Sequence, residues 1–96
     1  MRFTKTGKEA GDCTTPYSVT DYKATTVAEF IIEVLENFQN EWGRISVGGW
    51  FGMYPSCEYR YGKLITELPQ ELLDKKIKKI DSNGGWTCMD YEIYTE

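Results

Sequence analysis

The chain has 96 residues and a formal net charge of −4, with 41% hydrophobic, 27% charged and 15% aromatic residues. This length supports one domain with one modest core, and the acidic balance argues against non-specific binding to a nucleic-acid backbone. No apolar run is long enough to cross a membrane, and the N-terminus lacks the apolar core of a signal peptide. We therefore expect a cytoplasmic protein.

The N-terminal residues are polar and show no periodicity. We expect a flexible arm over residues 1–13 and a single domain over residues 14–96. The segment 14–24 is rich in Thr, Val and Tyr, which is typical of a strand, and Pro16 fits only at the start or edge of that strand.

The next segment carries the clearest pattern in the sequence. Thr26 and Glu29 have the spacing of a capping box, which marks the start of a helix. Six apolar residues follow at the spacing of one helical stripe: Val27, Phe30, Ile31, Val34, Leu35 and Phe38. The pattern predicts a helix over about residues 27–39, and Gly43 can end the connection that follows. The opposite face of this helix carries Glu29, Glu33 and Glu36. We interpret that face as exposed to solvent or, alternatively, as a docking face for a basic partner.

After this helix the apolar period changes to two, which is typical of strands. Strands are expected around Ile45 and Val47, from Cys57 to Tyr61, over 77–81 and over 86–94, with a short helix over about 69–75. In the last strand, Met89, Tyr91 and Ile93 fall on one face. The other face carries Trp86, Cys88, Asp90, Glu92 and Tyr94. The predicted fold class is α+β, with about five mostly antiparallel strands, one long amphipathic helix packed on one face and a second short helix.

Catalysis is disfavoured by the residue types that the chain lacks. It has no histidine, so the usual general base is missing, and its three cysteines show no CxxC spacing. Cys57 and Cys88 therefore have no evident base to activate them. Asp90 is the best single candidate for acid–base chemistry. No metal site and no cofactor are expected.

Binding is easier to build from these residues. Six of the fourteen aromatic residues lie in the segment 42–61, and Gly-Gly-Trp occurs both there and at 84–86. Aromatic rings can stack on a planar group while a guanidinium holds an anion. The predicted site for a flat anionic molecule comprises Trp50, Tyr54, Tyr59, Arg60, Tyr61, Trp86 and Asp90. The alternative is that Tyr59 and Tyr61 are core or interface residues and Arg60 pairs with a glutamate.

The surplus of aromatic residues also favours association. We expect a homodimer or larger assembly, with the segment from Trp50 to Tyr61 near the contact. A basic run at Lys75, Lys76, Lys78 and Lys79 is interpreted as a solvated face, an anion-binding surface or a contact for the acidic helix face of a second copy.

Four segments, TTVAEFIIEVLEN, NEWG, CEYRYGKLITELPQELLDKKIKKI and NGGWTCMDY, carry a family resemblance. Together they resemble a family of short uncharacterised proteins from gut bacteria and their phages, over roughly residues 22–94. The resemblance implies a compact α+β domain of phage or mobile-element origin, and it transfers no functional residue. Such an origin suggests that the protein sequesters a nucleotide immune signal or, alternatively, inhibits or accompanies a host protein through its aromatic surface.

Overall fold

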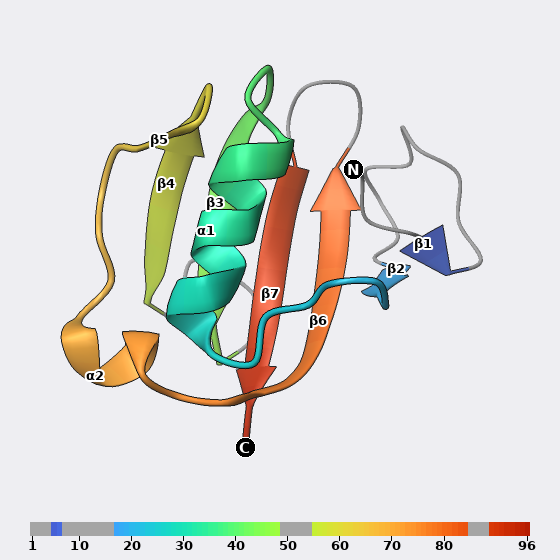
Figure 1. Cartoon of the computed structure of the whole chain (residues 1–96), viewed down its shortest axis with the longest axis vertical. Helices are drawn as coiled ribbons and strands as arrows, with labels where there is room; N and C mark the ends of the chain where they lie inside the picture. The colour runs from blue at the N-terminus through green and yellow to red at the C-terminus, as the bar shows by residue number, and fades with distance from the viewer. Residues whose placement is uncertain (1–4, 7–16, 49–54, 85–88) are drawn as a thin grey trace.

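The computed structural model describes residues 5–6, 17–48, 55–84 and 89–96. The strands in this part of the chain form one sheet in the spatial order β1-β2-β6-β7-β3-β4-β5 (Figure 1). Their bounds are β1 (Lys5–Thr6), β2 (Tyr17–Val19), β3 (Trp42–Val47), β4 (Ser56–Arg60), β5 (Lys63–Leu64), β6 (Ile77–Gly84) and β7 (Met89–Thr95). Neighbouring strands are antiparallel except β3 and β7, which run parallel in the middle of the sheet.

Two helices accompany the sheet: α1 (Val27–Asn37) and α2 (Gln70–Leu73). The capping box that the sequence predicts is confirmed: the Thr26 hydroxyl accepts from the Glu29 N–H at 3.3 Å, and the Glu29 carboxylate accepts from the Thr26 N–H at 3.1 Å. The carboxylate also accepts from the hydroxyl and N–H of Thr25, and these hydrogen bonds lower the pKa of Glu29 to about 2. Neither helix in the described part of the chain is long and apolar enough to cross a membrane.

Helix α1 lies across one face of the sheet, in front of β3 and β7 in Figure 1. Phe30 is fully buried, and its ring meets the ring of Tyr91 edge to face with a centroid distance of 5.3 Å. The alternating residues Met89, Tyr91 and Ile93 of β7 are all buried, which confirms the face predicted for them. The core therefore lies between the apolar stripe of α1 and this face of the sheet.

A glycine inside β3 allows the central strands to pack closely. A Cβ atom at Gly43 would overlap the backbone carbonyl oxygen of Met89 in β7. The sequence suggested that Gly43 ends the connection after the helix. In the structure Gly43 lies within β3, opposite Tyr59 of β4, and its missing side chain makes room for β7.

The predicted fold class is wrong. The structure is mostly sheet, with seven strands in the described residues in place of about five, and the sheet is mixed. No long amphipathic helix is present in the described chain: α1 has 11 residues and ends at Asn37, and α2 has four. The two additional strands, β1 and β5, have only two residues each, which is too short for a period-two pattern to appear. Strand β1 falls within the segment expected to be an arm.

Candidate functional site

A small hollow lies where β3 begins and β4 ends. Trp42 and Arg60 are directly opposite each other in the antiparallel pair of these strands. Together with Tyr61 they line a hollow of about 190 Å³. We call this group of three residues the aromatic notch. It places two rings and one guanidinium around a single space, which is the set of groups that can stack on a planar molecule and hold its negative charge.

The notch is open to solvent. The relative exposures of Trp42 and Tyr61 are 42% and 59%, and Arg60 is also exposed. Arg60 forms no ion pair with any residue that the structure describes, whereas Arg44, on the next rung of the same face, lies 4.0 Å from Glu58. The Arg60 guanidinium thus keeps its hydrogen-bonding capacity for a bound group.

The position of Tyr61 follows from the turn between β4 and β5. Arg60 pairs with Lys63, so Tyr61 and Gly62 form a two-residue hairpin loop. Both have positive φ, 50° and 80°, which is the type I′ geometry that matches the twist of a hairpin. Asn and Gly are the usual residues at such positions, and a tyrosine with this backbone is strained by about 1–3 kcal/mol. Local strain of this kind is found at functional sites.

Two contacts outside the hairpin fix this turn. The N–H of Tyr61 donates to the carbonyl oxygen of Glu41 at 2.8 Å, which ties the turn to the residue before β3. A Cβ atom at Gly62 would meet the Gln39 side chain at 3.3 Å, so the turn also packs against the chain that leaves α1. The strained residue is therefore held by the rest of the fold, as a pre-organised site requires.

The structure brings only part of the predicted site together. Arg60 and Tyr61 are in the notch, whereas Tyr59 is 1% exposed and belongs to the core. Its hydroxyl donates to the Met89 carbonyl at 2.8 Å. The predicted site residues Trp50, Tyr54 and Trp86 lie outside the described residues, as do Gly49 and Gly85 of the two Gly-Gly-Trp segments.

Asp90 supports the backbone beside the notch. Its carboxylate accepts from the N–H of Arg44 at 3.0 Å, at the start of the parallel pairing of β3 and β7. Burial raises the pKa of Asp90, while this hydrogen bond and the Arg44 charge act in the opposite direction. The observed contact gives Asp90 a structural role.

Sequence reasoning missed Trp42 as a site residue. Trp42 stands 18 positions before Arg60, and only the register of β3 against β4 makes them neighbours. A partial signal was present at Gly62, because glycine readily adopts the positive φ that a two-residue hairpin turn requires. The pattern was instead interpreted as a strand continuing to Tyr61.

Cys57 is buried, and burial raises the pKa of its thiol to about 12, so it is not a thiolate at neutral pH. No group of three or more Cys, Asp or Glu residues in the described chain is placed to hold a metal ion.

Comparisons of the chain with protein-family models, with curated proteins and with solved structures found no match.

Proposed function

We propose that this protein is a small binding protein that holds a flat anionic molecule, of the nucleotide type, at the aromatic notch. The observation that carries this proposal is the pairing of Trp42 and Arg60 across β3 and β4, with Tyr61 beside them. A base ring would stack on Trp42 or Tyr61, and its phosphate would pair with Arg60.

The size of the notch limits what it can enclose. Its volume of about 190 Å³ is below the 300–1,000 Å³ typical of pockets that enclose a whole drug-sized ligand. One ring system or one phosphate fits inside, and the rest of the molecule would lie on the surface of the sheet. We therefore expect weak to moderate affinity for a single nucleotide, and a biological role in sequestering a signal of this class.

The setting of this role is also part of the proposal. The resemblance to short proteins of gut bacteria and their phages suggests interference with nucleotide signalling in a bacterial host. The free, buried thiol of Cys57 suits a reducing compartment such as the cytoplasm.

A second candidate function is protein binding through the same surface. Trp, Tyr and Arg are the residue types that dominate the energy of protein interfaces, and both rings of the notch are exposed. In this case the protein would inhibit or accompany a host protein. The two candidate functions are distinguished by whether the notch binds a nucleotide in the absence of a protein partner.

Calorimetric titration tests the main proposal. Adenine and guanine nucleotides, linear and cyclic, are titrated into the parent protein at two salt concentrations. We expect binding that weakens with salt, because the attraction to Arg60 is screened. Trp42→Ala should cost about 1–3 kcal/mol of binding free energy, the usual contribution of one stacking ring. Arg60→Ala should weaken binding and reduce its salt dependence.

Two control variants separate the notch from its surroundings. Lys63 is the strand partner of Arg60 across the hairpin and carries the same charge. The Lys63→Ala variant should still bind the nucleotide, because the proposal assigns the phosphate to Arg60. Tyr59→Phe changes a core residue and should leave affinity unchanged. If no nucleotide binds the parent while a host protein co-purifies with it and is lost in Trp42→Ala, the protein-binding function replaces the one proposed here.

A further inference from the structure

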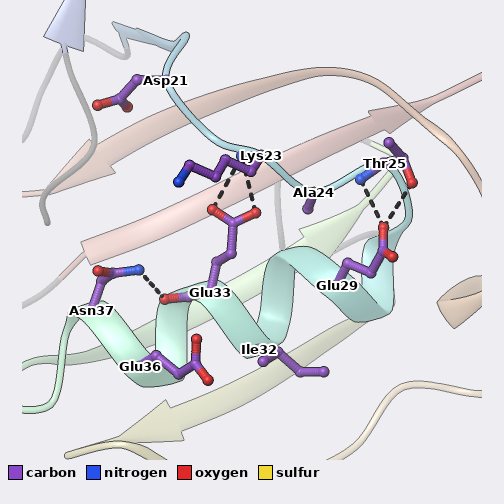
Figure 2. A pocket seen from close by; sticks show the side chains of 9 residues that line it. All are labelled: Asp21, Lys23, Ala24, Thr25, Glu29, Ile32, Glu33, Glu36 and Asn37. Carbon is purple, nitrogen blue, oxygen red and sulfur yellow. Dashed lines mark hydrogen bonds between the residues drawn. The ribbon is translucent and has the colours of Figure 1, made fainter.

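The outer face of α1 carries a second surface, separate from the aromatic notch. Glu29, Ile32, Glu33 and Glu36 are spaced along one stripe of the helix, facing away from the core. Between this stripe and the segment 21–25 lies a groove of about 510 Å³ (Figure 2). Ile32 is 54% exposed there, and it stands between the carboxylates of this stripe.

Part of this stripe is already used within the chain. The Glu33 carboxylate accepts from the N–H of Lys23 through both oxygens, at 3.0 and 3.1 Å, and Glu29 caps the helix. Glu36 also lines the groove, and Figure 2 draws no hydrogen bond to its carboxylate. None of these three glutamates forms an ion pair with a lysine or arginine that the structure describes, so the stripe keeps its negative charge.

The complementary charge lies at the other end of the same helix. The N–H of Val27 donates to the Lys75 carbonyl at 3.0 Å, and the backbones of Thr26 and Lys76 form an isolated antiparallel β-bridge. The basic run thus passes beside the N-terminal end of α1, as Figure 1 shows for the connection from α2 to β6. Lys75, Lys76 and Lys78 are exposed and have no ion pair among the described residues.

The glutamates and the lysines lie at similar distances from Ile32, on opposite sides of it along the helix axis. Ile32 is the middle residue of Val27–Asn37. At 1.5 Å per residue, Glu36 lies about 6 Å from this centre in one direction, and the Val27 end, with the lysines beside it, lies about 7.5 Å away in the other. A two-fold rotation about Ile32 would therefore bring the Glu33 and Glu36 end of one helix toward the lysines of another. Glu29 lies at the same end as the lysines, but its carboxylate is held by the capping hydrogen bonds from Thr25 and Thr26.

We propose that two copies of this chain associate through the outer faces of α1, with the helices antiparallel and Ile32 packed against the partner's Ile32. The Glu33 and Glu36 end of each helix then faces Lys75, Lys76 and Lys78 of the other copy. Such a contact is isologous and closes as a dimer. Its apolar centre is small and its ion pairs are exposed, so the dimer is weak and sensitive to salt.

Light scattering and sedimentation across a concentration series test this dimer, at about 20 mM and about 500 mM salt, where screening is weak and strong respectively. We expect the parent to dimerise at low salt, with a dissociation constant at least tenfold higher at high salt. Glu36→Lys alone and Lys76→Glu alone should each weaken the dimer about tenfold, because each places like charges together. The double variant should recover it, since the pair is then restored with its signs exchanged.

Three further variants complete the test. Ile32→Asp should weaken the dimer at both salt concentrations, because it places two carboxylates at the two-fold axis. Glu58→Lys and Arg44→Glu change the net charge by the same amounts at exposed side chains on the face of the sheet away from α1, and they should leave the dimer intact. Thermal melting checks that every variant is folded. A parent that stays monomeric at low salt, or a double variant no better than the single ones, overturns the proposal.

Discussion

Glu92 lies directly opposite Asp81 in the antiparallel pair of β7 and β6, and no part of its side chain is exposed to solvent. It lies on the face of the sheet away from α1, between Asp81 on one side and Ser46 of β3 on the other. Neither oxygen of its carboxyl group has a hydrogen-bond partner among the described residues. Burial raises the pKa of Glu92 to about 8, and the negative charges of Asp90 and Asp81 add to this effect.

The buried carboxyl makes stability depend on pH. The pKa of Glu92 is higher in the folded chain than its ordinary value of 4.5, so the folded state holds this proton over a range where the unfolded state has lost it. The free energy of unfolding should therefore fall as pH rises from about 4.5 to about 8, with a slope from this group of up to about 1.4 kcal/mol per pH unit. Denaturant melts at several pH values measure the slope.

Glu92→Gln is the matched variant for this measurement. The amide has nearly the same shape and does not titrate, so the variant should show a flatter pH profile over the same range. Asp81→Asn removes one of the charges that raise the pKa, and it should move the range toward lower pH. Parallel profiles for the parent and Glu92→Gln would show that Glu92 does not cause the pH dependence.

Truncation of the helix stripe should affect stability according to burial. Phe30 is fully buried between Tyr22 and Tyr91, so Phe30→Ala should lower the free energy of unfolding by about 3–5 kcal/mol. Leu35 is only partly buried, and Leu35→Ala should cost about 1–2 kcal/mol. Ile32→Ala, on the outer face, should stay within about 0.5 kcal/mol of the parent. Chemical denaturation checks this order, and equal losses at all three positions would contradict it.

Gly43→Ala tests the close approach of β3 and β7. The added methyl group would overlap the Met89 carbonyl, which belongs to the backbone and cannot move as a side chain would. The substitution should therefore destabilise the protein by about 1–3 kcal/mol, the usual cost of overpacking. A melting curve like that of the parent would mean that the two strands separate easily at this point.

Tyr61→Asn should increase stability while it weakens ligand binding. Asparagine adopts positive φ with less strain than tyrosine, so the turn should gain about 1 kcal/mol. The same change removes one ring of the aromatic notch, so nucleotide affinity should fall. Melting and calorimetry on the same sample measure both effects. A variant less stable than the parent would show that the Tyr61 ring stabilises the fold by packing.

Some features of this protein were predictable from sequence because their causes are local. Thr26 and Glu29 define the start of α1 within a single helical turn, where side chains reach the free N–H groups directly. The alternation of Met89, Tyr91 and Ile93 identifies the buried face of β7, since a strand places every second side chain on the same side. Arg60 and Tyr61 were predicted as ligand-binding residues from their chemistry, and both line the aromatic notch.

The tertiary structure decided the features that depend on pairing between distant segments. The parallel pairing of β3 with β7 has no local signature, and it determines the mixed sheet. The register of β3 against β4 places Trp42 opposite Arg60, while the turn at Tyr61 and Gly62 separates Tyr61 from the buried Tyr59. Glu92 occupies a position that alternation assigns to the polar face, yet it is fully buried. Burial depends on what packs over a face, and a residue's own sequence neighbours do not determine that.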